Sequence, residues 1–154
     1  MPLKVHKKGV FGKHQKIYGF LLTFTPAAAD SILKFLGDTN TSPEDYDLIF
    51  TGDLGYIGTQ CLYELLDREG VDIRCRHTDC GDIIFDRENQ DVHGGGSGCG
   101  CSASVLCSYV MHRLEDGQLN NILFLSTGAL MSPTSSYQGE SVPGIAHLLN
   151  IRNQ

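Results

Sequence analysis

The residues with the clearest chemical potential form a glycine-rich loop, residues 93–103. It reads His93-Gly94-Gly95-Gly96-Ser97-Gly98-Cys99-Gly100-Cys101-Ser102-Ala103, and five of its eleven residues are glycine. Glycine lets a backbone adopt positive φ and approach a ligand with no Cβ in the way. Apolar residues at helical spacing follow up to Glu115, so the loop leads into a helix that Ser102 is predicted to cap. Because helix N-termini attract anions, we interpret the loop as an anion-binding cradle, against the alternative of a close helix–sheet crossing that needs glycine.

Asp53 is the second candidate, because it follows closely after the apolar run Tyr46–Thr51. Such a run predicts a strand covered on both faces, and open α/β sheets place their sites at the carboxyl ends of strands. The Asp53 carboxylate could contact a ligand or a Ca²⁺ ion, which prefers oxygen ligands. Its more common role would be to cap the helix that follows.

The six cysteines are interpreted as thiols, because a chain of this length does not need disulfides to fold. Cys99 and Cys101 could act as nucleophiles at the helix end, although small buried cysteines are more common. Candidates for a zinc site are Cys75, His77, Cys80, His93, Cys99 and Cys101. Their spacings differ from the usual Cys-x₂-Cys pairs, so no metal site is expected. His147, in an apolar run, is expected to be a buried core histidine.

The elements that must position these residues follow from hydrophobic periodicity and glycine or proline boundaries. Helices are predicted from Thr25-Pro26 to Gly37, from Ile57 to a stop at Gly70, and over Ser104–Glu115. Strands are predicted at Tyr46–Thr51, Val71–Arg74, Ile122–Thr127 and Ile145–Ile151, with an edge strand near Val10-Phe11. Residues 78–91 are predicted as a polar surface excursion. The last two strands are joined by a loop without a helix, which allows an antiparallel pair, whereas the earlier ones need helical crossovers.

Length and charge restrict the class of protein. A chain of 154 residues is the size of one ordinary domain, and its net charge of −6 argues against a nucleic-acid-binding groove. We expect a basic N-terminal segment over residues 1–18 and a single domain over residues 19–154. The sequence has no apolar run long enough to span a membrane and no signal peptide, which predicts a protein that is cytoplasmic or peripheral at a membrane.

Several of these motifs together resemble the C-terminal half of the stage V sporulation protein AD family. They are Gly52-Asp53-Leu54-Gly55, the loop 93–103, Ile122–Leu130, Ser132-Pro133 and Gln138–Pro143, with Pro26–Asp30 upstream. The resemblance runs from about Gly19 to Ile151. It implies an α/β, thiolase-like half-fold: a five-stranded mixed β-sheet flanked by helices on both faces. It also implies a protein of endospore-forming bacteria that binds dipicolinic acid (pyridine-2,6-dicarboxylate) for its uptake into the developing spore, at the spore inner membrane and with other proteins of the sporulation membrane complex.

The resemblance further implies that the protein is not an enzyme. Gly52/Asp53 and Cys99 stand where thiolase-like condensing enzymes carry a catalytic His and Asn, and the half with the nucleophile is absent. The ligand-binding residues that it implies are Asp53, His93, Gly95, Gly96, Ser97, Gly98, Cys99 and Gly128. No cofactor is implied beyond Ca²⁺ carried with dipicolinate. A half-fold would expose an apolar face, so we expect a homo-oligomer or pairing with a missing N-terminal half. Two alternatives remain: an acyltransferase that uses Cys99 or Cys101, and a structural interaction module without a ligand pocket.

Overall fold

The structure is a computed structural model that describes residues 15–92, 98, 100–129, 138 and 144–153. The helices are α1 (Gln15–Thr39), α2 (Gly55–Arg68), α3 (Cys80–Ile84), α4 (Cys101–Val105) and α5 (Met111–Glu115). The π-helical segment Leu106–Val110 joins α4 to α5, and two 3-10 turns span Pro43–Asp45 and Arg74–Arg76. The strands are β1 (Leu48–Thr51), β2 (His77–Asp79), β3 (Asn121–Ala129) and β4 (Gly144–Arg152).

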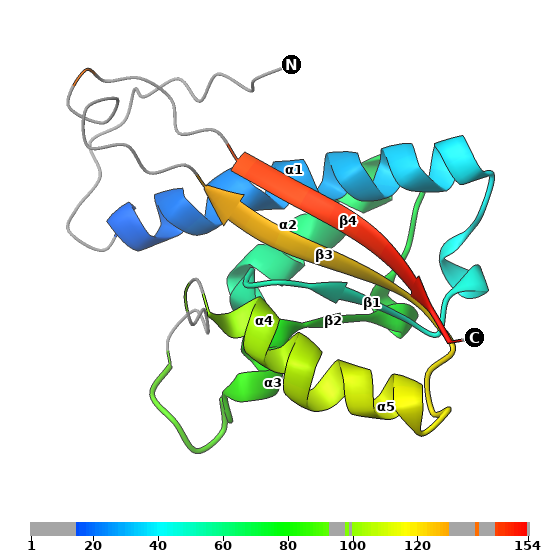
Figure 1. The fold of residues 1–154 in the computed structure, drawn as a ribbon. Coiled ribbons are helices and arrows are strands. Elements are labelled where there is room, and N and C mark those ends of the chain that lie inside the picture. Colours follow the sequence, from blue (N-terminus) through cyan, green and yellow to red (C-terminus); the bar gives the residue numbers. More distant parts are fainter. Residues whose placement is uncertain (1–14, 93–97, 99, 130–137, 139–143, 154) are drawn as a thin grey trace.

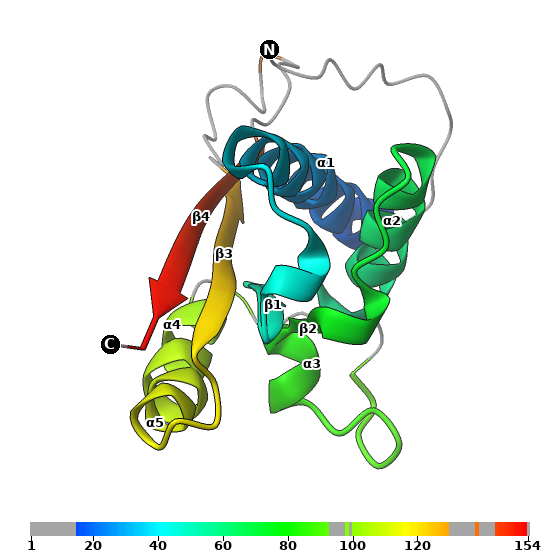
Figure 2. The ribbon, with the colours of Figure 1, turned by 90° about the vertical axis from the view of Figure 1, so that its right-hand side faces the viewer.

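The four strands form one mixed sheet in the order β2-β1-β3-β4. β1 runs parallel to both β2 and β3, and β4 pairs antiparallel with β3. Helices α1 and α2 cover one face, and α3, α4 and α5 cover the other (Figures 1 and 2). The predicted mixed α/β sheet with helices on both faces is therefore confirmed, as is the antiparallel pair. The described residues form four strands rather than the predicted five, and the edge strand near Val10-Phe11 lies outside them.

Two apolar cores flank the sheet. The first lies under α1 and α2 and includes Ile32, Ile49, Leu62 and Leu123. The second lies under α3, α4 and α5 and is made of Phe50, Cys80, Cys101, Val105, Val110, Leu114, Leu119, Ile122 and Phe124. Alternate residues of β1 and β3 enter opposite cores, which explains why both strands are apolar at successive positions.

The predicted start of the first helix is wrong. α1 begins at Gln15, ten residues before Thr25, and Pro26 lies inside it. Proline lacks an N–H and disfavours a helix on its N-terminal side, but it does not forbid one. Phe24, Ala28 and Ile32 are all buried against the sheet, so packing outweighs the local cost of Pro26.

The predictions between α2 and the glycine loop are also corrected. Residues 71–74 are not a strand: β2 follows the 3-10 turn Arg74–Arg76 and begins at His77. Residues 78–91 are not wholly a surface excursion, because they contain the end of β2 and helix α3. β2 has only three residues, all with polar side chains, so no apolar period marks it in the sequence.

Two predictions about single side chains are wrong. Ser102 does not cap its helix: the helix begins at Cys101 after Gly100, and no side-chain cap is formed. His147 is exposed, because β4 is the edge strand and its outer face is left open by the α4–α5 helix. The predicted apolar face of the α4–α5 helix is confirmed, since Val105, Val110 and Leu114 are buried.

No helix in the described part of the chain is long and apolar enough to cross a membrane.

Candidate functional site

The carboxyl ends of the three parallel strands bring most of the candidate residues to one edge of the sheet. Asp53 follows β1, Asp79 ends β2, and Gly128 lies near the end of β3. Of the eight predicted ligand-binding residues, the structure describes Asp53, Gly98 and Gly128, and it places all three at this edge. His93, Gly95, Gly96, Ser97 and Cys99 lie outside the described residues.

Asp53 holds the end of the glycine loop. Its Oδ2 accepts a hydrogen bond from the backbone N–H of Gly98 at 2.7 Å, across 45 positions of sequence. Gly98 has a φ of +93°, a conformation that favours glycine. Cys101, directly after Gly100, then starts α4, and its N–H donates to the Gly98 carbonyl. Asp53 therefore holds Gly98, and with it the start of α4, at the sheet edge.

Gly52 allows β1 and β3 to approach closely at this edge. A Cβ at Gly52 would lie 3.0 Å from the Thr127 nitrogen and 3.2 Å from the Leu125 carbonyl oxygen. It would also lie 3.1 Å from Thr127 Oγ1, a buried hydroxyl oxygen without a hydrogen-bond partner. Any larger side chain at position 52 would push the two strands apart. At Gly128, by contrast, an added Cβ would meet no atom within 4 Å.

Asp79 is the most heavily bonded carboxylate of the site, and sequence reasoning did not single it out. Its Oδ1 accepts from Thr51 Oγ1 at 2.6 Å and from the Leu54 N–H at 2.9 Å. Its Oδ2 accepts from the N–H groups of Gly55 and Gly81, both at 2.9 Å. Asp79 is 1% exposed. One carboxylate thus ties β1, the start of α2 and the start of α3 together, which is a structural role. An Asp directly before the short segment Cys80–Ile84 is the signal that could have identified it.

A half-buried histidine, His77, extends this network beneath α2. Thr51 donates its only proton to Asp79, so it must accept from His77 Nε2–H, at 3.0 Å. His77 Nδ1 then accepts from the Tyr63 hydroxyl at 2.9 Å. The imidazole is therefore neutral with its proton on Nε2. Burial lowers the pKa of His77 from 6.5 to about 4. His77 was a zinc candidate, and the structure uses it as a link in a hydrogen-bonded chain.

Asp82, on the first turn of α3, is an acid with a raised pKa. Burial and then the neighbouring Asp79 charge raise the pKa of Asp82 to about 6, against a smaller opposing effect of Arg87. Its Oδ1 is buried without a hydrogen-bond partner. A carboxyl group in such surroundings is protonated at mildly acidic pH, which removes one negative charge from this part of the molecule.

The described cysteines include a buried pair and two exposed thiols. Cys80 and Cys101 are buried, at 0% and 3% exposure, in the core beneath α4. Burial, followed by the Asp79 charge, raises the pKa of the Cys80 thiol above its ordinary range. Cys75 and Cys107 are exposed thiols. Among the described residues, no three His, Cys, Asp or Glu side chains lie close enough to hold a metal ion.

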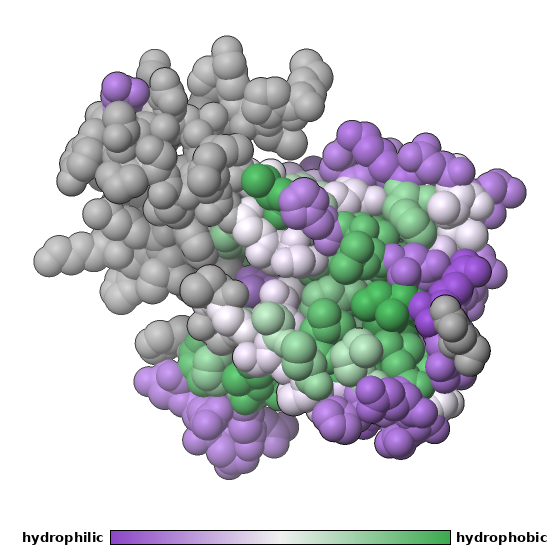
Figure 3. Space-filling view, in the orientation of Figure 1, coloured by the Kyte–Doolittle hydropathy of each residue, from purple (hydrophilic) through white to green (hydrophobic). Residues whose placement is uncertain are grey.

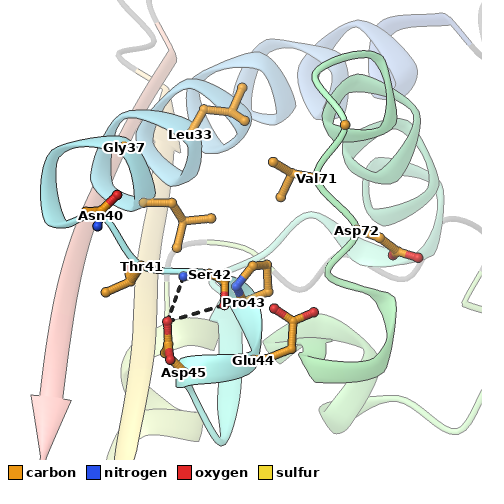
Figure 4. A pocket seen from close by; sticks show the side chains of 12 residues that line it. Leu33, Gly37, Asn40, Thr41, Ser42, Pro43, Glu44, Asp45, Val71 and Asp72 are labelled. Atoms are coloured by element: carbon orange, nitrogen blue, oxygen red, sulfur yellow. Dashed lines mark hydrogen bonds between the residues drawn. The ribbon is translucent and has the colours of Figure 1, made fainter.

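A surface groove lies away from this edge. It has a volume of about 840 Å³ and is lined by the end of α1, the turn Pro43–Asp45 and residues 70–72, with Leu33 and Leu36 on one wall (Figure 4). These segments precede β1 and β2, so the groove is at the amino ends of the strands. Glu44, Asp45 and Asp72 are its charged residues. It contains none of the predicted ligand-binding residues.

The fold and this edge define a class: a mixed α/β domain whose parallel strands end at a glycine-lined edge organised by carboxylates. Comparison of the sequence with known proteins identifies the family. The stage V sporulation protein AD family matches residues 19–152, and the chain belongs to it. It is 44% identical over 122 residues to stage V sporulation protein AD of Bacillus subtilis (strain 168). That alignment covers 79% of this chain and 36% of the relative, so the chain spans about a third of the relative's length.

Proposed function

We propose that this chain is a non-catalytic, thiolase-like sporulation protein that binds dipicolinic acid at the carboxyl edge of its sheet. In this proposal it takes part in uptake of the acid into the developing spore, at the spore inner membrane. Membership of the stage V sporulation protein AD family supports the sporulation role. The observation that carries the ligand site is the hydrogen bond from Gly98 N–H to Asp53, which fixes the glycine loop beside the start of α4.

The ligand chemistry follows from what this edge offers. Backbone N–H groups of a glycine loop and a helix N-terminus suit the carboxylates of a dicarboxylic acid. Two of the acids at this edge already have donors: Asp79 accepts four hydrogen bonds, and Asp53 accepts one from the Gly98 N–H. Since the described residues include no three-acid cage, Ca²⁺ enters the proposal only with the ligand, held mainly by the pyridine nitrogen and carboxylates of dipicolinate.

Tight packing around Gly52 supports the proposal that the protein is not an enzyme. The family resemblance places the catalytic histidine of condensing enzymes at Gly52/Asp53. A side chain at position 52 would collide with the backbone of Thr127 and Leu125, so an imidazole does not fit at that position without moving β3. The buried location of Cys101 also argues against its use as a nucleophile.

A second candidate function is a structural interaction module. The alignment covers 36% of the relative, so a ligand pocket of the longer protein can include residues outside the matched part. We propose in either case that the chain associates with a second protein chain, either a copy of itself or a protein that supplies the remaining part.

Calorimetric titration with dipicolinic acid, with and without Ca²⁺, tests the ligand proposal. Isophthalic acid, which has the same two carboxylates but no ring nitrogen, is the matched ligand control. We expect saturable binding that Asp53→Ala weakens by roughly tenfold, because the loop loses its anchor. Asp30→Ala is the matched control, since Asp30 is an exposed acid on α1 whose partner is Lys34. A folded chain without saturable binding would contradict the ligand site and favour the interaction module, as would equal effects of the two variants.

A further inference from the structure

The two edges of the sheet differ sharply. β2, at one edge, has three residues and turns at once into α3. β4, at the other edge, has nine residues, all of which are in unbroken register with β3. No described strand pairs with the free side of β4. Proteins usually protect a long edge strand with proline, a bulge or lysine residues, because an open edge pairs with other chains. β4 contains none of these.

The outer face of β4 is also apolar. Ile145 and Leu149 are 42% and 55% exposed, and the exposed His147 lies between them. Figure 3 shows apolar side chains gathered along this side of the molecule, between α1 and the α4–α5 helix. The opposite face of β4 is occupied, since Ala146 and Leu148 pack on the core beneath α1. The Ala146 carbonyl faces the free edge and accepts from Ser31 Oγ of α1 at 2.7 Å; its second lone pair remains for a strand partner.

We propose that the free edge of β4 is a self-association surface, through which two copies of this chain join their sheets. The inference deepens the association proposed above by choosing a second copy and a place. A two-fold axis at Leu148 would pair β4 antiparallel with itself over its full length. Ile145 of one copy then lies opposite Ile151 of the other, and His147 opposite Leu149, all on the same outer face. The resulting sheet is continuous and has eight strands.

Sequence and charge support a copy of this chain as the occupant. The nine residues of β4 carry a single formal charge, at Arg152, whereas the whole chain has a net charge of −6. Two identical acidic chains repel over most of their surfaces, and β4 is a neutral stretch where they can approach. In the two-fold register no like charges face each other, because Arg152 lies opposite Gly144. On the outer face Ile145 therefore meets Ile151, and the His147 ring meets Leu149.

Analytical ultracentrifugation of the full chain over a concentration series tests this inference, without added ligand. We expect a reversible dimer, and we expect Leu149→Lys to raise its dissociation constant by roughly tenfold or more, because two ammonium groups enter the paired face. Ile84→Lys is the matched control: Ile84 is 44% exposed on α3, away from β4, and its substitution should leave the dimer intact. Far-UV circular dichroism verifies that both variants are folded.

Hydrogen exchange tests whether β4 forms the dimer interface. Amides of β4 should exchange more slowly at high protein concentration in the wild type and not in Leu149→Lys. A wild-type chain that stays monomeric at high concentration would overturn the inference. So would a dimer that survives Leu149→Lys with no change in β4 exchange, or one that Ile84→Lys dissociates equally. Since dipicolinic acid is absent throughout, these results are separate from success or failure of the ligand proposal.

Discussion

Removal of the His77 imidazole should flatten the dependence of stability on pH. In the folded chain the half-buried His77 donates to Thr51 and accepts from Tyr63, and desolvation lowers its pKa from 6.5 to about 4. In the unfolded chain the imidazole regains its ordinary pKa. Below pH 6.5 the unfolded chain therefore binds a proton that the folded chain does not, and a fall in pH favours unfolding.

The magnitude follows from this difference in pKa. A difference of about 2.5 pKa units corresponds to about 3 kcal/mol once the pH has fallen through both values. At pH 5 the loss relative to neutral pH is about 2 kcal/mol. Asp82 acts in the opposite direction, because its pKa is raised to about 6 in the folded chain, so its contribution to stability improves as the pH falls. Because Asp82 is present in both the wild type and the His77 variant, its contribution cancels when their stabilities are compared.

Urea unfolding at neutral pH and at pH 5 provides the measurement. The chain has no tryptophan, so far-UV circular dichroism is the suitable signal. We expect the wild type to lose about 2 kcal/mol more than His77→Gln between the two pH values. His112→Gln, which removes an exposed imidazole on α5, is the control and should follow the wild type. If His77→Gln loses as much stability on acidification as the wild type, the assignment of a buried neutral imidazole is wrong.

Three further predictions concern the carboxyl edge and the cysteines. Asp79→Asn should lower the free energy of unfolding by about 3 kcal/mol or more, because an amide NH₂ would face N–H groups that now donate to a carboxylate. The exposed Asp86→Asn should cost less than about 1 kcal/mol in the same urea experiment, and equal costs would contradict the role of Asp79. Gly52→Ala should cost about 1 to 3 kcal/mol, because its Cβ would lie 3.0 Å from the Thr127 nitrogen, and an unchanged urea midpoint would refute that contact. In thiol labelling followed by mass spectrometry, Cys75 and Cys107 should react in the native state, while Cys80 and Cys101 should react only on unfolding; rapid native labelling of Cys80 would show that the core opens readily.

The elements that carry strong hydrophobic patterns could be placed from the sequence. The apolar runs of β1 and β3, the alternating closing strand β4 and the amphipathic faces of α2 and of the α4–α5 helix all appear close to their predicted positions. Their burial is decided by side chains within one segment, so a local pattern is sufficient. Gly70, with a φ of +75°, follows the end of α2 as predicted, because glycine adopts this conformation at little cost.

The elements without such a pattern required the tertiary structure. β2 is three residues long and polar, and it exists because β1 offers it a parallel partner. α1 continues through Pro26 because the sheet buries the residues on both sides of it. His147 looked like a core residue, but its exposure depends on its place at the edge of the sheet, and strand order is not encoded in any one segment.

The candidate site shows the same division. The glycine loop and Asp53 were recognisable from residue type and from position after a strand, whereas their contact spans 45 positions and depends on how α4 is placed against β1. Asp79 and His77 gave little local signal, because their roles consist of hydrogen bonds to Thr51, Tyr63, Gly55 and Gly81 on other elements. The residue types and hydrophobic periodicity of a chain determine which segments form helices or strands and which of their faces are apolar. Which buried polar groups find partners is decided only when the segments pack, because those partners are distant in sequence.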